Sequence, residues 1–202
     1  MLADAQQSPI TFADRIRLPL AFDARGSRAD LDGLAGIAWT DHLVTANYEG
    51  DWSVLPLRHA ASATHPVMQI YSDPTVRDYV DGPLLAHAPH IRAALATFAC
   101  PLQSVRLMRL SPGSRIKEHR DHDLAAEWGM ARIHVPITTN PGVTFLLNRE
   151  PVIMVPGEAW YLRLSDPHAV SNRGAADRVH LVIDAVVNDW LRAQLAIGQA
   201  RT

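Results

Sequence analysis

The second half of the chain is a series of short apolar runs separated by turn residues, and this pattern limits the possible fold more than any other feature of the sequence. The turns include Ser111-Pro112-Gly113 and Asn140-Pro141-Gly142. Short apolar runs broken by Gly, Pro and Asn are typical of strands in a β-rich fold. We therefore predict strands over 104–110, 131–137, 143–147, 152–155, 159–164 and 179–187.

Strands of this number and length predict a mainly β protein, a double-stranded β-helix of the jelly-roll, cupin-like type with a few flanking helices. The flanking elements are expected before residue 100 and at the end of the chain. They are an edge strand over 16–22 that contains Pro19, a helix from 28 to about 37 capped by Ser27, a turn and short strand within 48–58, a helix that begins near Pro89, and a last helix from Asn188 to about Gly198.

The length of 202 residues suits one domain, and no repeat or low-complexity segment divides the chain. We expect a single domain over 1–202. Its flanking elements would occupy 1–100, the β-helix core 101–187 and the last helix 188–202.

Charge and cysteine content exclude several classes of function. The 19 basic and 21 acidic residues give a net charge of −2 without a positive cluster, so we expect neither a nucleic-acid nor a membrane partner. Cys100 is the only cysteine, which excludes an intramolecular disulfide and a cysteine-based zinc site. The segment Met1–Pro9 lacks the pattern of a signal peptide. These features favour a cytoplasmic protein, and they leave its oligomeric state open.

A candidate metal site begins with His119-Arg120-Asp121, because residues two apart on an extended segment point the same way. The motif alone equally describes a solvated charged loop. His168 lies 49 residues after His119 and follows a predicted strand, although it could also simply end a loop after Asp166-Pro167. Two imidazoles and one carboxylate form the facial triad of non-haem Fe(II), with positions left open for a bidentate oxoacid and O2.

Three basic residues on predicted strands are candidates for binding the oxoacid. Arg178 begins an apolar strand, where it needs either a ligand carboxylate or an internal acid such as Asp184. Arg132 and His134 alternate on one strand and so share a face. Spacing alone does not say whether that face points inward or to solvent.

Together these segments resemble the bacterial aspartyl/asparaginyl β-hydroxylase family, over most of residues 16–190. The resemblance rests on the following segments in this order: 48–52 with 55–58, 105–113, 116–121, 132–137, 157–160, 167–172 and 178–184.

The resemblance implies an Fe(II)/2-oxoglutarate-dependent dioxygenase that couples oxidative decarboxylation of 2-oxoglutarate to hydroxylation of a C–H bond. Members act on peptidyl aspartate or asparagine, and similar enzymes act on free proline. By similarity, His119, Asp121 and His168 bind iron, Arg178 binds the distal carboxylate of 2-oxoglutarate, and Arg132 and His134 line the cosubstrate pocket. Relatives have a serine where this chain has Met108, so one cosubstrate hydrogen bond is expected to be missing or replaced.

The expected substrate is a small molecule or peptide, namely an amino acid or a peptidyl residue. Candidate substrate contacts are Trp128, Trp52, Arg109 and Arg58, each of which has a purely structural alternative. Trp52 in particular could anchor a loop on the core.

Two other functions fit the same sequence. A cupin-type binding protein or sensor would keep the pocket without turnover, and it would not need Asp121. A cupin isomerase or hydrolase would hold another divalent metal, such as zinc or manganese.

Overall fold

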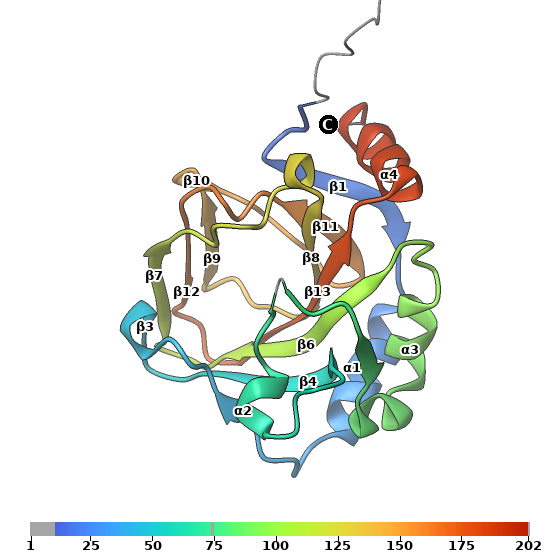
Figure 1. The fold of residues 1–202 in the computed structure, drawn as a ribbon. Coiled ribbons are helices and arrows are strands. Elements are labelled where there is room, and N and C mark those ends of the chain that lie inside the picture. The colour runs from blue at the N-terminus through green and yellow to red at the C-terminus, as the bar shows by residue number, and fades with distance from the viewer. Residues whose placement is uncertain (1–10, 74, 202) are drawn as a thin grey trace, which may run out of the picture.

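The computed structural model describes residues 11–73 and 75–201 and contains two antiparallel β-sheets that lie face to face (Figure 1). The larger sheet has the strand order β1-β11-β8-β13-β6-β4-β2, with β5 paired to β4, and the smaller has the order β10-β9-β12-β7-β3. This arrangement confirms the predicted mainly β, jelly-roll fold.

The large-sheet strands are β1 (Arg15–Ala21), β2 (Thr40–Asp41), β4 (Trp52–Ala60), β5 (Tyr79–Asp81), β6 (Leu102–Leu110), β8 (Met130–Thr138), β11 (Glu158–Leu162) and β13 (Arg178–Val186). The small-sheet strands are β3 (Tyr48–Glu49), β7 (Arg115–His119), β9 (Val143–Leu147), β10 (Glu150–Pro151) and β12 (His168–Asn172).

Helices cover the outer face of the large sheet, on the side away from the small sheet (Figure 1). Helices α1 (Ala24–Gly33) and α3 (Pro89–Leu95) pack against each other there, and α4 (Asp189–Gln199) packs on β1. Pro89 is the first residue of α3, as predicted. The last helix also lies where it was predicted, and Asn188 caps it by accepting a hydrogen bond from the Leu191 N–H at 3.0 Å. Among the described residues, no helix is long and apolar enough to cross a membrane. The segment Met1–Pro9 lies outside them.

The two faces of the large sheet differ because strand residues alternate. On β13, Val179, Leu181 and Ile183 belong to the core under the helices. Val182 belongs to a second core, which lies between the two sheets. Every second residue from Arg178 to Asp184 therefore faces the smaller sheet, and these residues include the charged ones.

Two predicted elements differ from the structure. The first helix begins at Ala24 because Asp23, not Ser27, is its cap: the Asp23 carboxylate accepts a hydrogen bond from the Gly26 N–H at 2.9 Å. Ser27 is buried inside the helix.

The prediction of a strand over 152–155 is wrong. The segment has the alternation of a strand, with Val152 and Met154 buried and Ile153 80% exposed, but it forms no ladder. The neighbouring pairing is limited to β10 and β9. Alternation reports burial on one face, whereas a strand also needs a partner edge.

Helices α1 and α3 are joined by His90, whose Nδ1 lies 2.8 Å from a carboxylate oxygen of the buried Asp30. The hydrogen bond to Asp30 raises the pKa of His90. A raised pKa stabilises the fold below the unfolded value of about 6.5, and this stabilisation is lost as the pH rises through the folded pKa. We expect His90→Ala to lower the melting temperature in mildly acidic buffer and to change it little in alkaline buffer. An equal change in both buffers would contradict a charge-dependent contact.

Candidate metal centre

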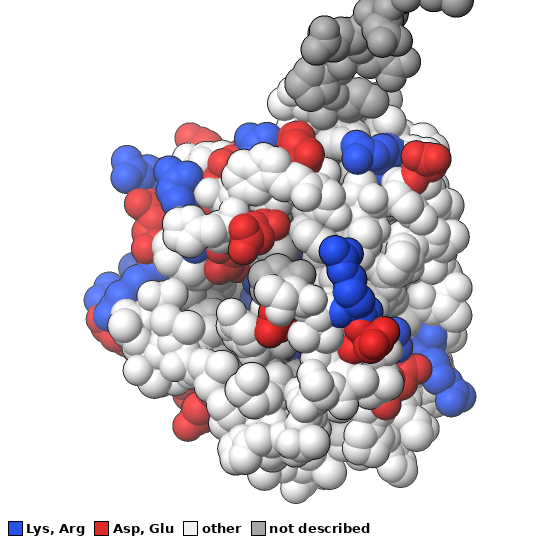
Figure 2. All heavy atoms as spheres, in the orientation of Figure 1, with Lys and Arg blue, Asp and Glu red and all other residues white. Residues whose placement is uncertain are grey.

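A cavity of about 510 Å³ lies between the two sheets, and all three predicted metal ligands line it. Strands of both sheets form its walls, and the segments 42–47 and 70–72 form part of its rim. The face drawn in Figure 2 is hollowed near its centre, and acidic and basic side chains are interspersed on it without an extended patch of one sign. A cavity of this size suits a small molecule or one residue of a peptide.

His119 and His168 are brought together by strand register. They are directly paired residues of the neighbouring strands β7 and β12, and their ring centroids are 4.2 Å apart. Each ring turns Nδ1 to a backbone carbonyl, at 2.8 Å from Lys117 O and 3.0 Å from Asp166 O. These carbonyls accept from Nδ1–H, so in the neutral form of each ring Nε2 is proton-free and available to a metal.

Asp121 completes the group just after the end of β7. Its backbone N–H donates to Leu164 O at 2.8 Å, which fixes the turn, and its Oδ1 lies 3.7 Å from His119 Nε2. The ligand atoms of His119, Asp121 and His168 all lie within 4.8 Å of one another. Two neutral imidazoles and one carboxylate at this separation fit the facial triad of non-haem Fe(II). This arrangement argues against the loop alternatives for both motifs.

The electrostatics of the site favour metal binding near neutral pH. Burial, and secondly the neighbouring His119, lower the pKa of His168 to about 4. The His168 ring is therefore neutral at pH 7, the state in which imidazole binds a metal.

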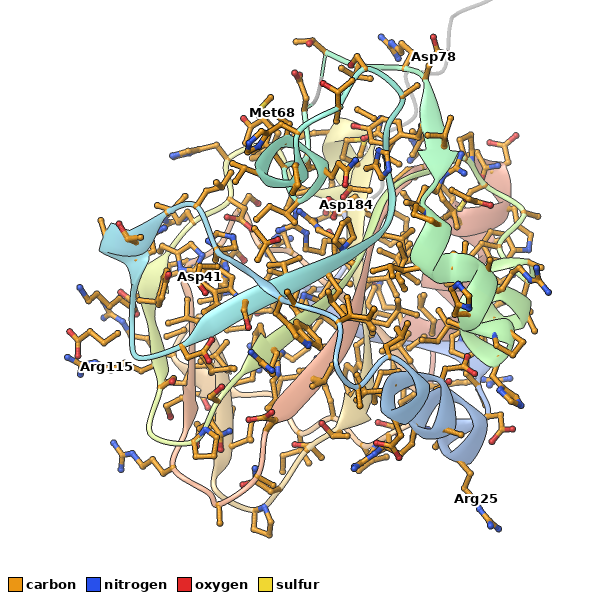
Figure 3. All side chains as sticks on the ribbon, turned by 90° about the horizontal axis from the view of Figure 1, so that it is seen from below. Arg25, Asp41, Met68, Asp78, Arg115 and Asp184 are labelled. Atoms are coloured by element: carbon orange, nitrogen blue, oxygen red, sulfur yellow. The ribbon has the colours of Figure 1, made fainter. Side chains whose placement is uncertain are left out.

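Arg132 and His134 point inward, which decides the alternative that their spacing left open. Arg132 is one of a chain of charged groups: its Nε donates to Asp184 Oδ1 at 2.6 Å and its Nη1 donates to Asp121 Oδ2 at 2.7 Å. Arg106 holds the other Asp184 oxygen at 2.6 Å. Figure 3 shows Asp184 in the interior of the molecule. Although burial raises the pKa of Asp184, Arg132 and Arg106 outweigh it and hold that pKa well below its usual range.

Arg178 has a different environment from the other two arginines of the cavity. It is 2% exposed, and its Nη2 donates to His180 Nδ1 at 2.9 Å. No carboxylate in the described part of the chain pairs with Arg178, so the salt bridge to Asp184 that the sequence left possible does not form. Burial alone lowers the pKa of Arg178 to about 9, which still leaves it charged at pH 7. Its Nε and the Nε2 of His134 are buried without a protein partner in the same residue set.

The structure brings one of the four candidate substrate residues to the cavity. Trp52 lines it and stacks on His42 with ring centroids 3.5 Å apart. Trp128 is 64% exposed and does not line the cavity.

Arg58 and Arg109 do not line the cavity either, and both have structural partners. Arg58 pairs with Asp81 at 2.6 Å and donates to the Leu102 carbonyl. Arg109 lies 3.6 Å from Asp51 and over the ring of Trp39. Arg109 points away from the cavity because it alternates along β6 with Arg106 and Met108, which line it. Arg58 has the parity of Trp52, but a register irregularity between Pro56 and Arg58 places it opposite Val105, a residue of the core under the helices.

Three polar residues of the site were not among the candidates predicted from the sequence. Arg106 lines the cavity, and His180 contacts both Arg178 and His134. A signal for His180 was present, since Arg178, His180 and Asp184 share one parity in an otherwise apolar strand. His42 carries no such signal, because it lies in the loop after the two-residue strand β2, where no alternation is available to show its direction.

Comparisons with known proteins give a family match and several solved structures with a similar fold. The family described as Aspartyl/Asparaginyl beta-hydroxylase matches residues 39–187. An oxidoreductase of the 2OG-Fe(II) oxygenase family from Burkholderia pseudomallei is 17% identical, with a TM-score of 0.52 over 86% of this chain and 85% of that one. A prolyl-4-hydroxylase from Pseudomonas putida is 12% identical, with a TM-score of 0.52 over 87% and 93%.

A third solved structure, a non-heme alpha ketoglutarate dependent carbocyclase from nogalamycin biosynthesis, is 12% identical, with a TM-score of 0.51 over 86% of this chain and 79% of that one. At these identities the solved structures show a shared fold. The family match spans more than half of the chain, including the triad and Arg178. The chain therefore belongs to the aspartyl/asparaginyl β-hydroxylase family.

Proposed function

We propose that the protein is an Fe(II)/2-oxoglutarate-dependent dioxygenase that hydroxylates a C–H bond of an amino acid or a peptidyl residue and releases succinate and CO2. The observation that carries this proposal is the pairing of a complete His119–Asp121–His168 triad with a buried, carboxylate-free Arg178 in one cavity. The triad fits iron, and the arginine fits the far end of a dicarboxylic oxoacid.

Arg178 is the cosubstrate clamp in this proposal. A buried guanidinium without a counter-anion is costly, and a bidentate carboxylate would offset that cost. Both other arginines of the cavity already share Asp184. His134, whose Nε2 has no protein partner among the described residues, would line the same subsite.

The chain itself provides binding, orientation and exclusion of water. Bound iron would supply the activation of O2, and the protein would hold the reacting groups together in a cavity shielded by both sheets. The Nδ1–H bonds to backbone carbonyls orient His119 and His168. No side chain needs to transfer a proton.

The substrate proposal rests on the family name and on the wall around Trp52. Burial lowers the pKa of His42 to about 3, so the stacked His42–Trp52 pair is an uncharged aromatic surface at neutral pH. Such a surface, next to a charged network, suits a substrate with an apolar part and a polar end.

The test is succinate release with Fe(II), ascorbate and 2-oxoglutarate, screened over free amino acids and short peptides that include Asp, Asn and Pro. We expect at least one of them to raise succinate release well above the substrate-free rate, with a product heavier by one oxygen. A cupin-type binding protein would bind ligand without consuming 2-oxoglutarate. Stimulation only by a lipid, sugar or nucleobase would contradict the proposed substrate class.

A further inference from the structure

We infer that Arg132 is a positioning residue for the metal ligand Asp121 and not a ligand of the cosubstrate, and that the buried Asp184 fixes it in that role. The inference rests on the metal site of the proposed function. It replaces the role in the cosubstrate pocket that the family resemblance implies for Arg132.

The contacts of Arg132 are the first argument. All three guanidinium nitrogens donate to carboxylates: Nη1 to Asp121 Oδ2 at 2.7 Å, Nε to Asp184 Oδ1 at 2.6 Å and Nη2 to Asp184 Oδ2 at 2.9 Å. The pair with Asp184 is bidentate, which fixes the plane of the guanidinium as well as its distance. Arg132 therefore has a defined orientation without any ligand.

Asp184 is held in place by its surroundings as well as by Arg132. It is fully buried and lies directly opposite Arg132 in the β13–β8 register. Arg106 holds it from the other side, and Arg106 in turn donates to the Ile70 carbonyl at 3.0 Å. The anchor is thus a packed part of the large sheet.

Asp121 is the group that needs this anchor. It lies beyond the end of β7, and its side chain is 29% exposed, so the strand itself does not fix its rotamer. With Oδ2 held by Arg132, Oδ1 is left on the side of His119 Nε2. The geometry presents one carboxylate oxygen to the metal and keeps it there before the metal binds.

The charges support the same assignment. The charged chain has two positive members, Arg106 and Arg132, and two negative members, Asp184 and Asp121. It therefore has no uncompensated positive charge to bind the dianionic cosubstrate. Arg178 is the buried cation without such compensation in the described residues. Arg132 and Arg178 therefore have separable roles.

The experiment measures the dissociation constant for Mn(II) by calorimetry without 2-oxoglutarate, and then the Michaelis constant for 2-oxoglutarate. Arg132→Met is compared with wild type and with the matched variant Arg178→Met. We expect Arg132→Met to weaken Mn(II) binding by roughly 10- to 100-fold, the range typical of lost partners of metal ligands. Arg178→Met should leave Mn(II) binding unchanged and raise the Michaelis constant for 2-oxoglutarate.

Arg132→Lys serves as the second variant in case Arg132→Met does not fold. A lysine keeps a charge beside Asp184, but its single ammonium cannot hold both carboxylates with the geometry of the guanidinium fork. Weaker Mn(II) binding by Arg132→Lys supports the inference. Wild-type Mn(II) affinity in a folded Arg132 variant overturns it, with or without a raised Michaelis constant. Failure of the wild-type protein to bind Mn(II) or Fe(II) would instead overturn the proposed function.

Discussion

Alanine at His119, Asp121 or His168 is expected to abolish 2-oxoglutarate turnover while leaving the protein folded. All three side chains line the cavity and offer ligand atoms, and none of them belongs to either of the two apolar cores. Loss of one member of a three-ligand site removes the geometry that the metal requires. The measurements are succinate release and the melting temperature of each metal-free variant.

The matched control is His122→Ala. His122 also lines the cavity and is exposed, but it is not part of the triad. It should keep most of the activity. A His168→Ala protein with wild-type activity at limiting iron would remove His168 from the ligand set.

Arg178→Met is expected to raise the Michaelis constant for 2-oxoglutarate by about a hundredfold or more, because loss of one partner of a desolvated charge pair costs about 3–5 kcal/mol. Methionine retains much of the apolar stem and removes the fork, so the large sheet should stay packed. Burial without a protein carboxylate lowers the pKa of Arg178 to about 9, so a bound carboxylate would stabilise its charged form. The measurement is the dependence of succinate release on 2-oxoglutarate concentration.

Arg109→Met is the control for Arg178→Met, since Arg109 lies outside the cavity and pairs with Asp51. It should leave the Michaelis constant for 2-oxoglutarate near the wild-type value. If Arg178→Met also left it unchanged, another cation of the cavity would have to bind the cosubstrate.

The fold class could be predicted because apolar runs and turn residues report strands directly. The edge position of β1, the start of α3 at Pro89 and the cap of α4 at Asn188 all follow from local rules of proline and capping chemistry. The segment 152–155 shows the limit of these rules. Its residues alternate like a strand, but whether a partner edge is present depends on the tertiary structure.

Spacing together with the family resemblance pointed to the triad residues, yet the strands that carry His119 and His168 were not predicted. β7 reads Arg-Ile-Lys-Glu-His and β12 reads His-Ala-Val-Ser-Asn, so neither has an apolar run. Both are short strands of the small sheet with few apolar residues, and pairing to neighbouring strands rather than hydrophobicity defines them. The contacts of Arg132 were out of reach for a related reason, because its partners Asp121 and Asp184 lie on different elements.

The most direct test of the central claim is an anaerobic titration of the metal-free protein with Fe(II) and 2-oxoglutarate, followed by visible absorption. A bidentate 2-oxoacid on Fe(II) in the triad predicts a charge-transfer band that appears only when both are present and saturates at one equivalent of iron. Asp121→Ala should lose the band. Absence of the band in a wild-type protein that binds Zn(II) or Mn(II) tightly would contradict the account and favour a cupin isomerase or hydrolase.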